Sequence, residues 1–376
     1  MTRATHEPIP HRATAEDERY LQQQLITCIG NKRSLLPLIG QGVELVRQLL
    51  GKERLRCADL FAGSGIVSRY LKRSSTFLLA NDLERYSQLI NQCYLTNASE
   101  LDPALLAQTH RALLGEIEAT LAPGFITDLY APADETRITA HDRVFYTRQN
   151  AIYLDTARQA IARLPSELQH LFLGPLLSRA SVHANTAGVF KGFYKNANGV
   201  GQFGGSGRDA LARIRGQIVL DLPVLSRFDC ESRVTCQDAN TLVQSMDEVD
   251  LAYIDPPYNQ HPYGSNYFML NLLADYVRPA EISRVSGIPK GWTRSRYNRR
   301  QESEQALVEL IDACPARYVL VSYNSEGFVA RPRLAERLAS MGELTILEQP
   351  YATFRGSRNL RERELSVTEY LFVLEK

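Results

Sequence analysis

The sequence predicts an α/β protein with a mostly parallel sheet and a largely helical domain inserted into it. In the first hundred residues, short apolar runs alternate with stretches in which apolar residues recur at helical spacing, which is typical of βαβ units. From about residue 101 to residue 229 this alternation stops, and helical stretches accompany a segment rich in glycine and asparagine. Strand-like runs return after residue 250 and continue to the carboxyl end.

The amino-terminal part has the pattern helix, strand, glycine turn, helix, strand, helix. The corresponding segments are residues 34–50, 55–61, 62–65, 66–71, 76–80 and a last helix that ends near residue 94. Because each strand is followed by a helix, we expect both strands to belong to one parallel sheet.

The later part supplies the remaining strands, and the middle part interrupts them. Strand character appears at residues 251–254, 318–322, 344–348 and 368–374, and the last two are expected to form an antiparallel edge. The middle part contains helical stretches such as 155–164 and seven glycines between Thr186 and Gly207. We therefore expect two domains: an α/β domain from residues 1–100 and 230–376, and an inserted domain from residues 101–229.

Composition and charge indicate an ordinary globular protein. Lys and Arg total 43 against 42 Asp and Glu, so the overall charge points to no particular partner. No run approaches 18 apolar residues and the first twenty residues are polar, which argues against a membrane span and a secretory signal. The six cysteines form no Cys-x-x-Cys pair and fit free thiols better than disulfides or a zinc site. We expect a cytoplasmic protein without a metal.

The first loop that carries chemistry lies at the end of the first strand and spans Asp59 to Gly65. Its glycines, Gly63 and Gly65, let the backbone approach a ligand closely and turn sharply into the next helix. Asp82 lies 21 residues after Phe61, at the end of the next strand, where an acid can accept hydrogen bonds from ribose hydroxyls. Taken alone, this arrangement fits a nicotinamide-cofactor fold equally well.

The second loop is Asp255-Pro256-Pro257-Tyr258, which follows the apolar run 251–254. Two consecutive prolines fix the backbone and remove two N–H donors, so the loop is rigid and presents carbonyl oxygens. The Asp255 carboxylate and a proline carbonyl can hold both hydrogens of an aromatic amino group and direct its lone pair toward a methyl donor. Tyr258 offers a flat face on which a base can stack.

With these motifs the sequence resembles the class alpha adenine-N6 DNA methyltransferases, the Dam-like family, and in particular the modification methylases of restriction systems. The resemblance covers most of the chain and implies a Rossmann-like fold that depends on S-adenosylmethionine, with target recognition in the insertion. It also implies a cognate restriction endonuclease as a genetic partner and Asp255, Pro256, Pro257 and Tyr258 as the catalytic loop.

The resemblance further implies which residues bind the methyl donor. Lys32, in the motif Gly30 to Leu36, is expected to contact the donor, and Cys28 precedes it where the family often has an aromatic residue. The loop from Asp59 to Gly65 matches the part that surrounds the methionine moiety, and Asp82 matches the ribose ligand. The implied cofactor-binding residues are Cys28, Lys32, Asp59, Phe61, Gly63, Gly65, Asp82, Asp238 and Asp255, with Asp238 at the adenine edge of the donor. Ser322-Tyr323-Asn324 resembles a strand end that shapes the target-base pocket.

Adenine N6 is hidden in the base stack of a duplex, so the enzyme must flip the base out and hold the phosphates around its active site. A basic segment at 284–300 contains no acid and includes Trp292, and Lys191, Lys195 and Asn198 stand in the glycine-rich part of the insertion. Asn and Arg are suited to base edges in the major groove. The expected DNA-binding residues are Lys191, Lys195, Asn198, His261, Lys290, Arg294, Arg296 and Arg299.

We therefore expect a site-specific methyltransferase that acts on adenine N6 in double-stranded DNA. The same chemistry on cytosine N4, on an RNA adenine or on a protein glutamine is an alternative, although Asp255 favours adenine and the long insertion favours duplex DNA. A catalytically silent DNA-binding relative is a second alternative, and the complete loop from Asp255 to Tyr258 argues against it. A nicotinamide-dependent oxidoreductase leaves that loop unexplained.

Overall fold

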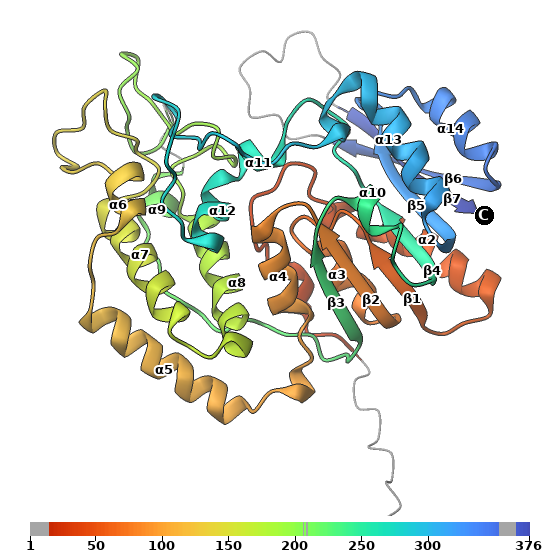
Figure 1. The fold of residues 1–376 in the computed structure, drawn as a ribbon, viewed down its shortest axis with the longest axis horizontal. Helices are drawn as coiled ribbons and strands as arrows, with labels where there is room; N and C mark the ends of the chain where they lie inside the picture. Colours follow the sequence, from red (N-terminus) through yellow and green to blue (C-terminus); the bar gives the residue numbers. More distant parts are fainter. Residues whose placement is uncertain (1–14, 206, 208–209, 353–365) are drawn as a thin grey trace, which may run out of the picture.

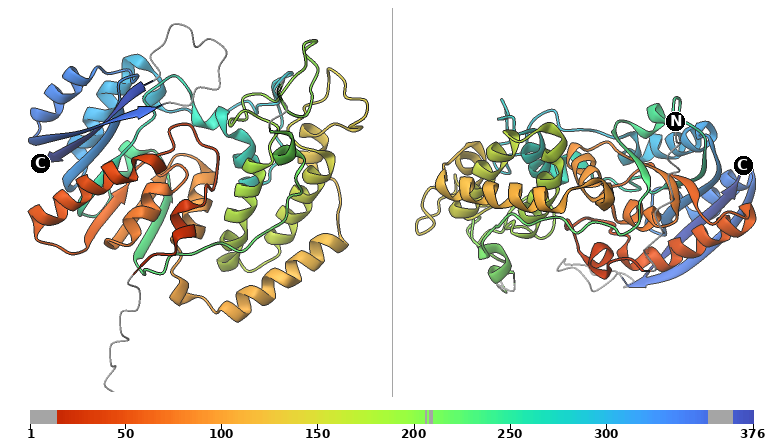
Figure 2. Two further views of the ribbon diagram at one scale, coloured as in Figure 1. Left: turned by 180° about the vertical axis from the view of Figure 1, so that it is seen from behind. Right: turned by 90° about the horizontal axis from the view of Figure 1, so that it is seen from below.

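A sheet lobe and a helical lobe lie side by side in the computed structural model (Figures 1 and 2). The structure describes residues 15–205, 207, 210–352 and 366–376. The predicted α/β fold is confirmed, because the sheet lobe contains a seven-stranded and mostly parallel sheet.

The strands are arranged in the order β3-β2-β1-β4-β5-β7-β6. Their bounds are β1 Leu55–Asp59, β2 Ser75–Asp82, β3 Glu231–Cys236, β4 Val249–Ile254, β5 Ala316–Asn324, β6 Glu343–Ala352 and β7 Ser366–Glu375. Strands β3, β2, β1, β4 and β5 are parallel neighbours, whereas β7 is antiparallel to both β5 and β6. The expected antiparallel edge is therefore present, formed by the last two strands of the chain.

Helices cover both faces of the sheet, as the burial of the central strands requires. One face packs against α2 (Leu36–Leu50) and α3 (Ile66–Lys72). The short helix η1 (Arg33–Leu35) directly precedes α2. The other face packs against α10 (Ala239–Leu242), α13 (Arg300–Ala313) and α14 (Arg331–Ala339). The short elements α1 (Glu18–Gln22), η2 (Ala98–Glu100), α11 (Tyr263–Asn266) and η3 (Arg296–Asn298) lie in the connections.

The helical lobe has its own apolar core. It contains α5 (Pro103–Ala119), α6 (Phe125–Tyr130), α7 (Arg148–Ala162), α8 (Ser166–Val182), α9 (Leu211–Arg215) and α12 (Phe268–Asp275). Buried residues of α4 (Arg85–Leu95) belong to the same core, and α4 packs against α8 and α12. The lobe is therefore joined to the sheet through α4 and not through a thin linker (Figure 1).

The sequence pattern located every strand of the sheet except β3. This strand has the sequence Glu-Ser-Arg-Val-Thr-Cys and lies at the sheet edge, where half of its residues are exposed and none is fully buried. A strand that buries so little has no reason to show a clear apolar pattern. Among the described residues, no helix is both long and apolar enough to cross a membrane.

Candidate functional site

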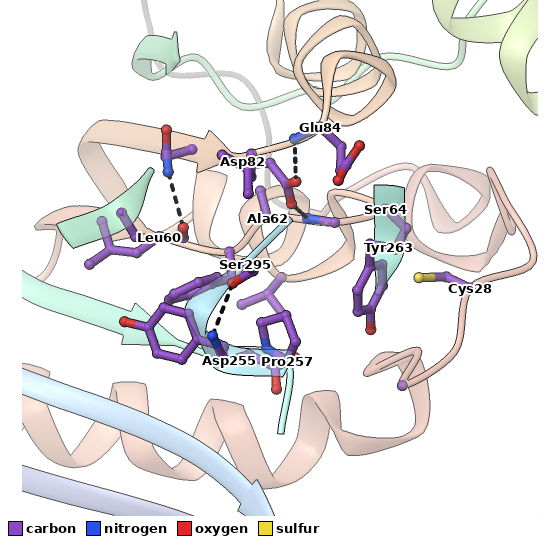
Figure 3. Close-up of a pocket in the computed structure, with 18 of the residues that line it drawn as sticks. Cys28, Leu60, Ala62, Ser64, Asp82, Glu84, Asp255, Pro257, Tyr263 and Ser295 are labelled. Atoms are coloured by element: carbon purple, nitrogen blue, oxygen red, sulfur yellow. Dashed lines mark hydrogen bonds between the residues drawn. The ribbon is translucent and has the colours of Figure 1, made fainter. Parts of the chain in front are cut away.

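The carboxyl ends of four parallel strands bring separate loops to one edge of the sheet. These loops line an open cleft of about 870 Å³ together with the segments around Cys28 and Ser295 (Figure 3). The loop residues that line it include Phe61 and Gly63 after β1, Asp82 at the end of β2, Asp238 after β3 and Asp255 after β4. In an open α/β sheet, this edge is where ligands bind.

The turn after β1 is tight and held by backbone hydrogen bonds. The Ala62 N–H donates to the Asn81 carbonyl at 2.8 Å, and the Gly65 N–H donates to the Ala62 carbonyl at 2.7 Å. Gly65 has φ +76°, and a Cβ there would lie 2.7 Å from Asn91 Oδ1. Glycine is therefore required at position 65 by both conformation and space.

Asp82 is held by two backbone donors in the cleft. Its Oδ2 accepts from the Gly63 N–H at 2.7 Å and its Oδ1 from the Glu84 N–H at 2.9 Å (Figure 3). Burial raises the pKa of Asp82, while these backbone donors lower it. Each carboxylate oxygen has a second lone pair that can accept from a hydroxyl group in the cleft.

The nine expected cofactor-binding residues do not all reach the cleft. Cys28, Lys32, Phe61, Gly63, Asp82, Asp238 and Asp255 line it, whereas Asp59 and Gly65 do not. Asp59 is 1% exposed, and its Oδ2 accepts from Ser68 Oγ at 2.6 Å. Burial raises the pKa of Asp59 to about 7. Asp59 therefore lies beneath the glycine turn, bonded to α3.

The loop after β4 is built around a buried ion pair. Lys32 Nζ lies 3.0 Å from Asp255 Oδ1, and the Lys32 side chain is only 4% exposed. Lys32 Nζ also donates to the Tyr258 hydroxyl at 3.3 Å. Lys32, which we expected at the methyl donor, therefore lines the cleft and also holds the first and last residues of the Asp255–Tyr258 loop.

The charge of each residue in this pair shifts the pKa of the other. Burial raises the pKa of Asp255 to about 6, and the nearby Lys32 ammonium limits the rise. Burial alone would lower the pKa of Lys32, but the Asp255 carboxylate helps to raise it well above its usual range. At neutral pH the pair is therefore an ammonium and a carboxylate.

A smaller cavity of about 280 Å³ adjoins the cleft at Asp255. It is lined by Ile29, Gly30, Lys32, Asp255, Pro256, Pro257, Tyr258, Asn259 and Tyr263. Lys32, Asp255 and Pro257 line both spaces. The Tyr258 ring packs 5.3 Å from the Tyr323 ring, and the Tyr258 carbonyl accepts from the Phe328 N–H at 3.0 Å. Two ligands could thus meet at Asp255, one in each space.

Glu84 is a cleft residue that the sequence analysis missed. Its side chain is 3% exposed, and its Oε2 accepts from Asn271 Nδ2 of α12 at 2.5 Å. Burial raises the pKa of Glu84 to about 7, and the Asn271 hydrogen bond opposes this rise. The only signal in the sequence is that a second acid follows Asp82 by two residues.

The residues expected to contact nucleic acid differ in whether a carboxylate of the protein already pairs with their side chains. Lys290 pairs with Glu281 at 2.5 Å, Arg296 with Glu309 at 2.8 Å and Arg299 with Glu302 at 2.8 Å. Arg294 instead stacks on Trp292 at 4.4 Å and has no carboxylate partner among the described residues. Lys191, Lys195, Asn198 and His261 are all exposed. The basic segment also sends Thr293, Ser295 and Asn298 into the cleft.

Comparisons with known proteins point to DNA methyltransferases over most of the chain. The family model of the D12 class N6 adenine-specific DNA methyltransferases matches residues 29–324. The chain is 28% identical over 335 residues to the Type II methyltransferase M.NlaIII of Neisseria lactamica, which covers 85% of this chain and 90% of that protein. It is 27% identical to the Type II methyltransferase M.CviAII of Paramecium bursaria Chlorella virus 1, over 84% of this chain and 88% of that protein.

Another relative is about twice as long as the matched region. The Type II methyltransferase M.FokI of Planomicrobium okeanokoites is 26% identical over 362 residues, which is 93% of this chain and 52% of that protein. No group of three or more His, Cys, Asp or Glu side chains in the described part of the chain is arranged to hold a metal ion.

The ion pair can be tested by titration. Replacing Lys32 by methionine removes the ammonium, so we expect Lys32→Met to raise the pKa of Asp255 from about 6 by roughly one to two units. Carboxyl ¹³C NMR of protein labelled at aspartate measures this pKa, with the Asp255 signal assigned from Asp255→Asn.

Lys52→Met is the matched control, because Lys52 pairs with Asp250 on the same strand at 2.6 Å and is half exposed. It should leave the Asp255 titration unchanged. An Asp255 pKa that is the same in Lys32→Met and the parent would contradict the pairing.

Proposed function

The chain belongs to the D12 class of N6 adenine-specific DNA methyltransferases, and we propose that it uses S-adenosylmethionine to methylate adenine within a specific duplex site. The observation that carries this proposal is the Asp255–Tyr258 loop, which borders both cavities. The large cleft is suited to the methyl donor and the small cavity to a base flipped out of the duplex.

The residues of the cleft fit S-adenosylmethionine. Asp82 offers two oxygens that can accept from ribose hydroxyls, and the positive φ of Gly63 and Gly65 leaves backbone close to the cleft. Asp238 and Lys32 line the same space. We propose that Asp238 contacts the adenine edge of the donor and that Lys32 contacts the donor beside the catalytic loop. When bound, S-adenosylmethionine supplies a methyl group on a positively charged sulfur.

The loop after β4 is proposed to hold the amino group that receives the methyl. An aromatic amine is a poor nucleophile because its lone pair is delocalised into the ring. The Asp255 carboxylate and the Pro256 carbonyl can accept its two hydrogens, which favours a tetrahedral nitrogen with its lone pair directed at the cleft. Tyr258, fixed by Tyr323, offers a face on which the flipped base stacks.

We propose that the helical lobe, and in particular residues 101–229, selects the DNA site. Lys191, Lys195 and Asn198 are exposed in its glycine-rich segment, and residues of this type suit phosphates and base edges. Because M.NlaIII and M.CviAII are named Type II methyltransferases, we further propose that this chain protects DNA from a cognate restriction endonuclease.

The direct test is methyl transfer from labelled S-adenosylmethionine to unmethylated plasmid DNA, followed by mass analysis of the nucleosides. We expect N6-methyldeoxyadenosine from the parent and a loss of at least about a hundredfold in rate for Asp255→Ala, since it removes an acceptor needed in the transition state. Asp247→Ala, an exposed carboxylate at the other end of β4, is the control and should retain the parent rate.

Methylation of cytosine, of RNA or of protein in this assay would overturn the proposed substrate.

The pH dependence of the methylation rate tests the role of Asp255 in a second way. Asp255 accepts hydrogen bonds on both oxygens only when ionised, so the single-turnover rate should fall about tenfold per pH unit below the Asp255 pKa of about 6.

Donor binding can be measured without catalysis. Asp82→Asn removes the charge and one acceptor, so we expect the Kd for S-adenosylmethionine to rise by about tenfold to a hundredfold in calorimetry. Asp247→Asn is the control of equal chemistry at an exposed site. A Kd that does not change in Asp82→Asn would exclude Asp82 as the ribose ligand.

The DNA surface can be tested through salt dependence. Arg294→Ala should weaken duplex binding and reduce the slope of log affinity against log salt by about one, because it removes one phosphate contact. Arg296→Ala should have a smaller effect, since Arg296 is already paired with Glu309 at 2.8 Å. Fluorescence anisotropy with a duplex that the parent methylates measures the affinity of both variants and its salt dependence. An equal loss of affinity in Arg294→Ala and Arg296→Ala would contradict the expected difference between them.

A further inference from the structure

Glu369 on β7 is a buried carboxylate that the mechanism above does not use. It is 5% exposed, and its Oε1 accepts from Asn324 Nδ2 at 3.3 Å. Its Oε2 is buried and has no hydrogen-bond partner among the described residues. An ionised carboxylate in such a place costs free energy unless nearby charge compensates for it, so its surroundings need an explanation.

The strand register places Glu369 two strands away from the Asp255 end of β4, with β5 between them, at the carboxyl end of the parallel strands. β7 pairs with β5 so that Glu369 is opposite Asn324, at the strand end that the sequence analysis associated with the target-base pocket. Side chains alternate along a strand, so Glu369 points to the same face as Leu371 and Val373, which pack in the α2 core. Lys32 lies immediately before η1 and α2, and therefore at the same face.

The charge of Glu369 reaches the functional groups of the loop. It helps to raise the pKa of Lys32, of Asp255 and of Tyr258, although burial and the nearer charges have larger effects on each of these pKa values. Two charged groups, Lys32 and Glu369, act on Asp255, and they shift its pKa in opposite directions. The Asp255 charge in turn helps to raise the pKa of Asp59, and both carboxylates help to raise the pKa of Tyr253.

Glu369 changes the net charge of the group that it forms with Lys32 and Asp255. The charges of Lys32 and Asp255 cancel, and an ionised Glu369 adds one negative charge to them. During methyl transfer the amino nitrogen forms a bond to the methyl carbon, the carbon–sulfur bond breaks with its electrons on sulfur, and the positive charge moves to nitrogen. The nitrogen afterwards loses a proton to solvent. A negative charge close to that nitrogen stabilises the transition state more than the ground state.

We propose that Glu369 is a positioning residue for methyl transfer, which acts through Lys32 and Asp255 to make the buried loop site negative where the target amino group becomes positive. This inference rests on the proposed function. A purely structural role is the alternative, in which Glu369 only ties β7 to β5 through Asn324.

Three substitutions separate charge from structure. Glu369→Gln removes the charge and keeps the shape, Glu369→Asp keeps the charge, and Asn324→Ala removes the one hydrogen bond while the Glu369 charge remains. Glu375→Gln on the same strand is the control, because Glu375 forms a partly exposed ion pair with Arg317 at 3.0 Å. Circular dichroism and thermal unfolding establish that each variant is folded.

The first measurement is the Asp255 pKa by carboxyl ¹³C NMR, which does not depend on activity. We expect Glu369→Gln to lower it by up to about one pH unit, because the Glu369 charge helps to raise this pKa but less than burial does. Glu369→Asp, Asn324→Ala and Glu375→Gln should stay close to the parent. An unchanged Asp255 pKa in folded Glu369→Gln overturns the inference.

The second measurement is single-turnover methylation against pH at saturating donor and DNA. We expect Glu369→Gln to be about tenfold slower at neutral pH, with its acidic limb moved down by about one pH unit, and Glu369→Asp to recover most of the rate. The Kd for S-adenosylmethionine should stay within about twofold of the parent. A rate loss in Asn324→Ala equal to that in Glu369→Gln, with no shift of the limb, overturns the inference in favour of the structural role.

Failure of the proposed function gives a different result. In that case the parent itself produces no N6-methyldeoxyadenosine, whatever residue stands at 369. A parent that methylates adenine at the same rate and with the same pH profile as Glu369→Gln rejects the role of Glu369 alone.

Discussion

The buried ion pair between Lys32 and Asp255 connects the parts of the molecule on which the site depends. Lys32 comes from the segment before α2, and Asp255 comes from the end of β4 in the middle of the sheet. A half-paired charge in this position would be costly, so each residue requires the other to be in place. The pair also brings Lys32 within hydrogen-bond distance of Tyr258, and thus fixes both ends of the loop that lines both cavities.

The sequence was sufficient to predict which loops meet at the cleft. The glycine turn, the acid at Asp82 and the Asp255–Tyr258 loop each combine residue type and spacing with a strand end, and a parallel sheet must bring such ends together. Gly65 shows why the turn is recognisable, because only glycine fits both its φ and the space next to Asn91.

Features that arise from long-range packing could not be predicted in this way. β3 buries little and shows no apolar alternation, and Glu369 meets Asn324 only because β7 inserts between β5 and β6. The expected DNA contacts in the basic segment stay a prediction, and the sequence did not show that Arg296 and Arg299 face acids of α13 while Arg294 stacks on Trp292. Charge pairing is a property of the folded surface, and a run of basic residues does not reveal it.

The connection between the two lobes constrains how the proposed DNA contacts can act on the site at Asp255. α12 follows the loop from Asp255 to Tyr258 by about ten residues and packs in the core of the helical lobe, together with α4 from the sheet lobe. Asn271 of α12 also donates to Glu84, two residues after Asp82. A lobe held by a shared apolar core cannot rotate freely without disrupting close packing. The proposed selection of a DNA site would therefore depend on exposed loops that are carried by a fixed framework.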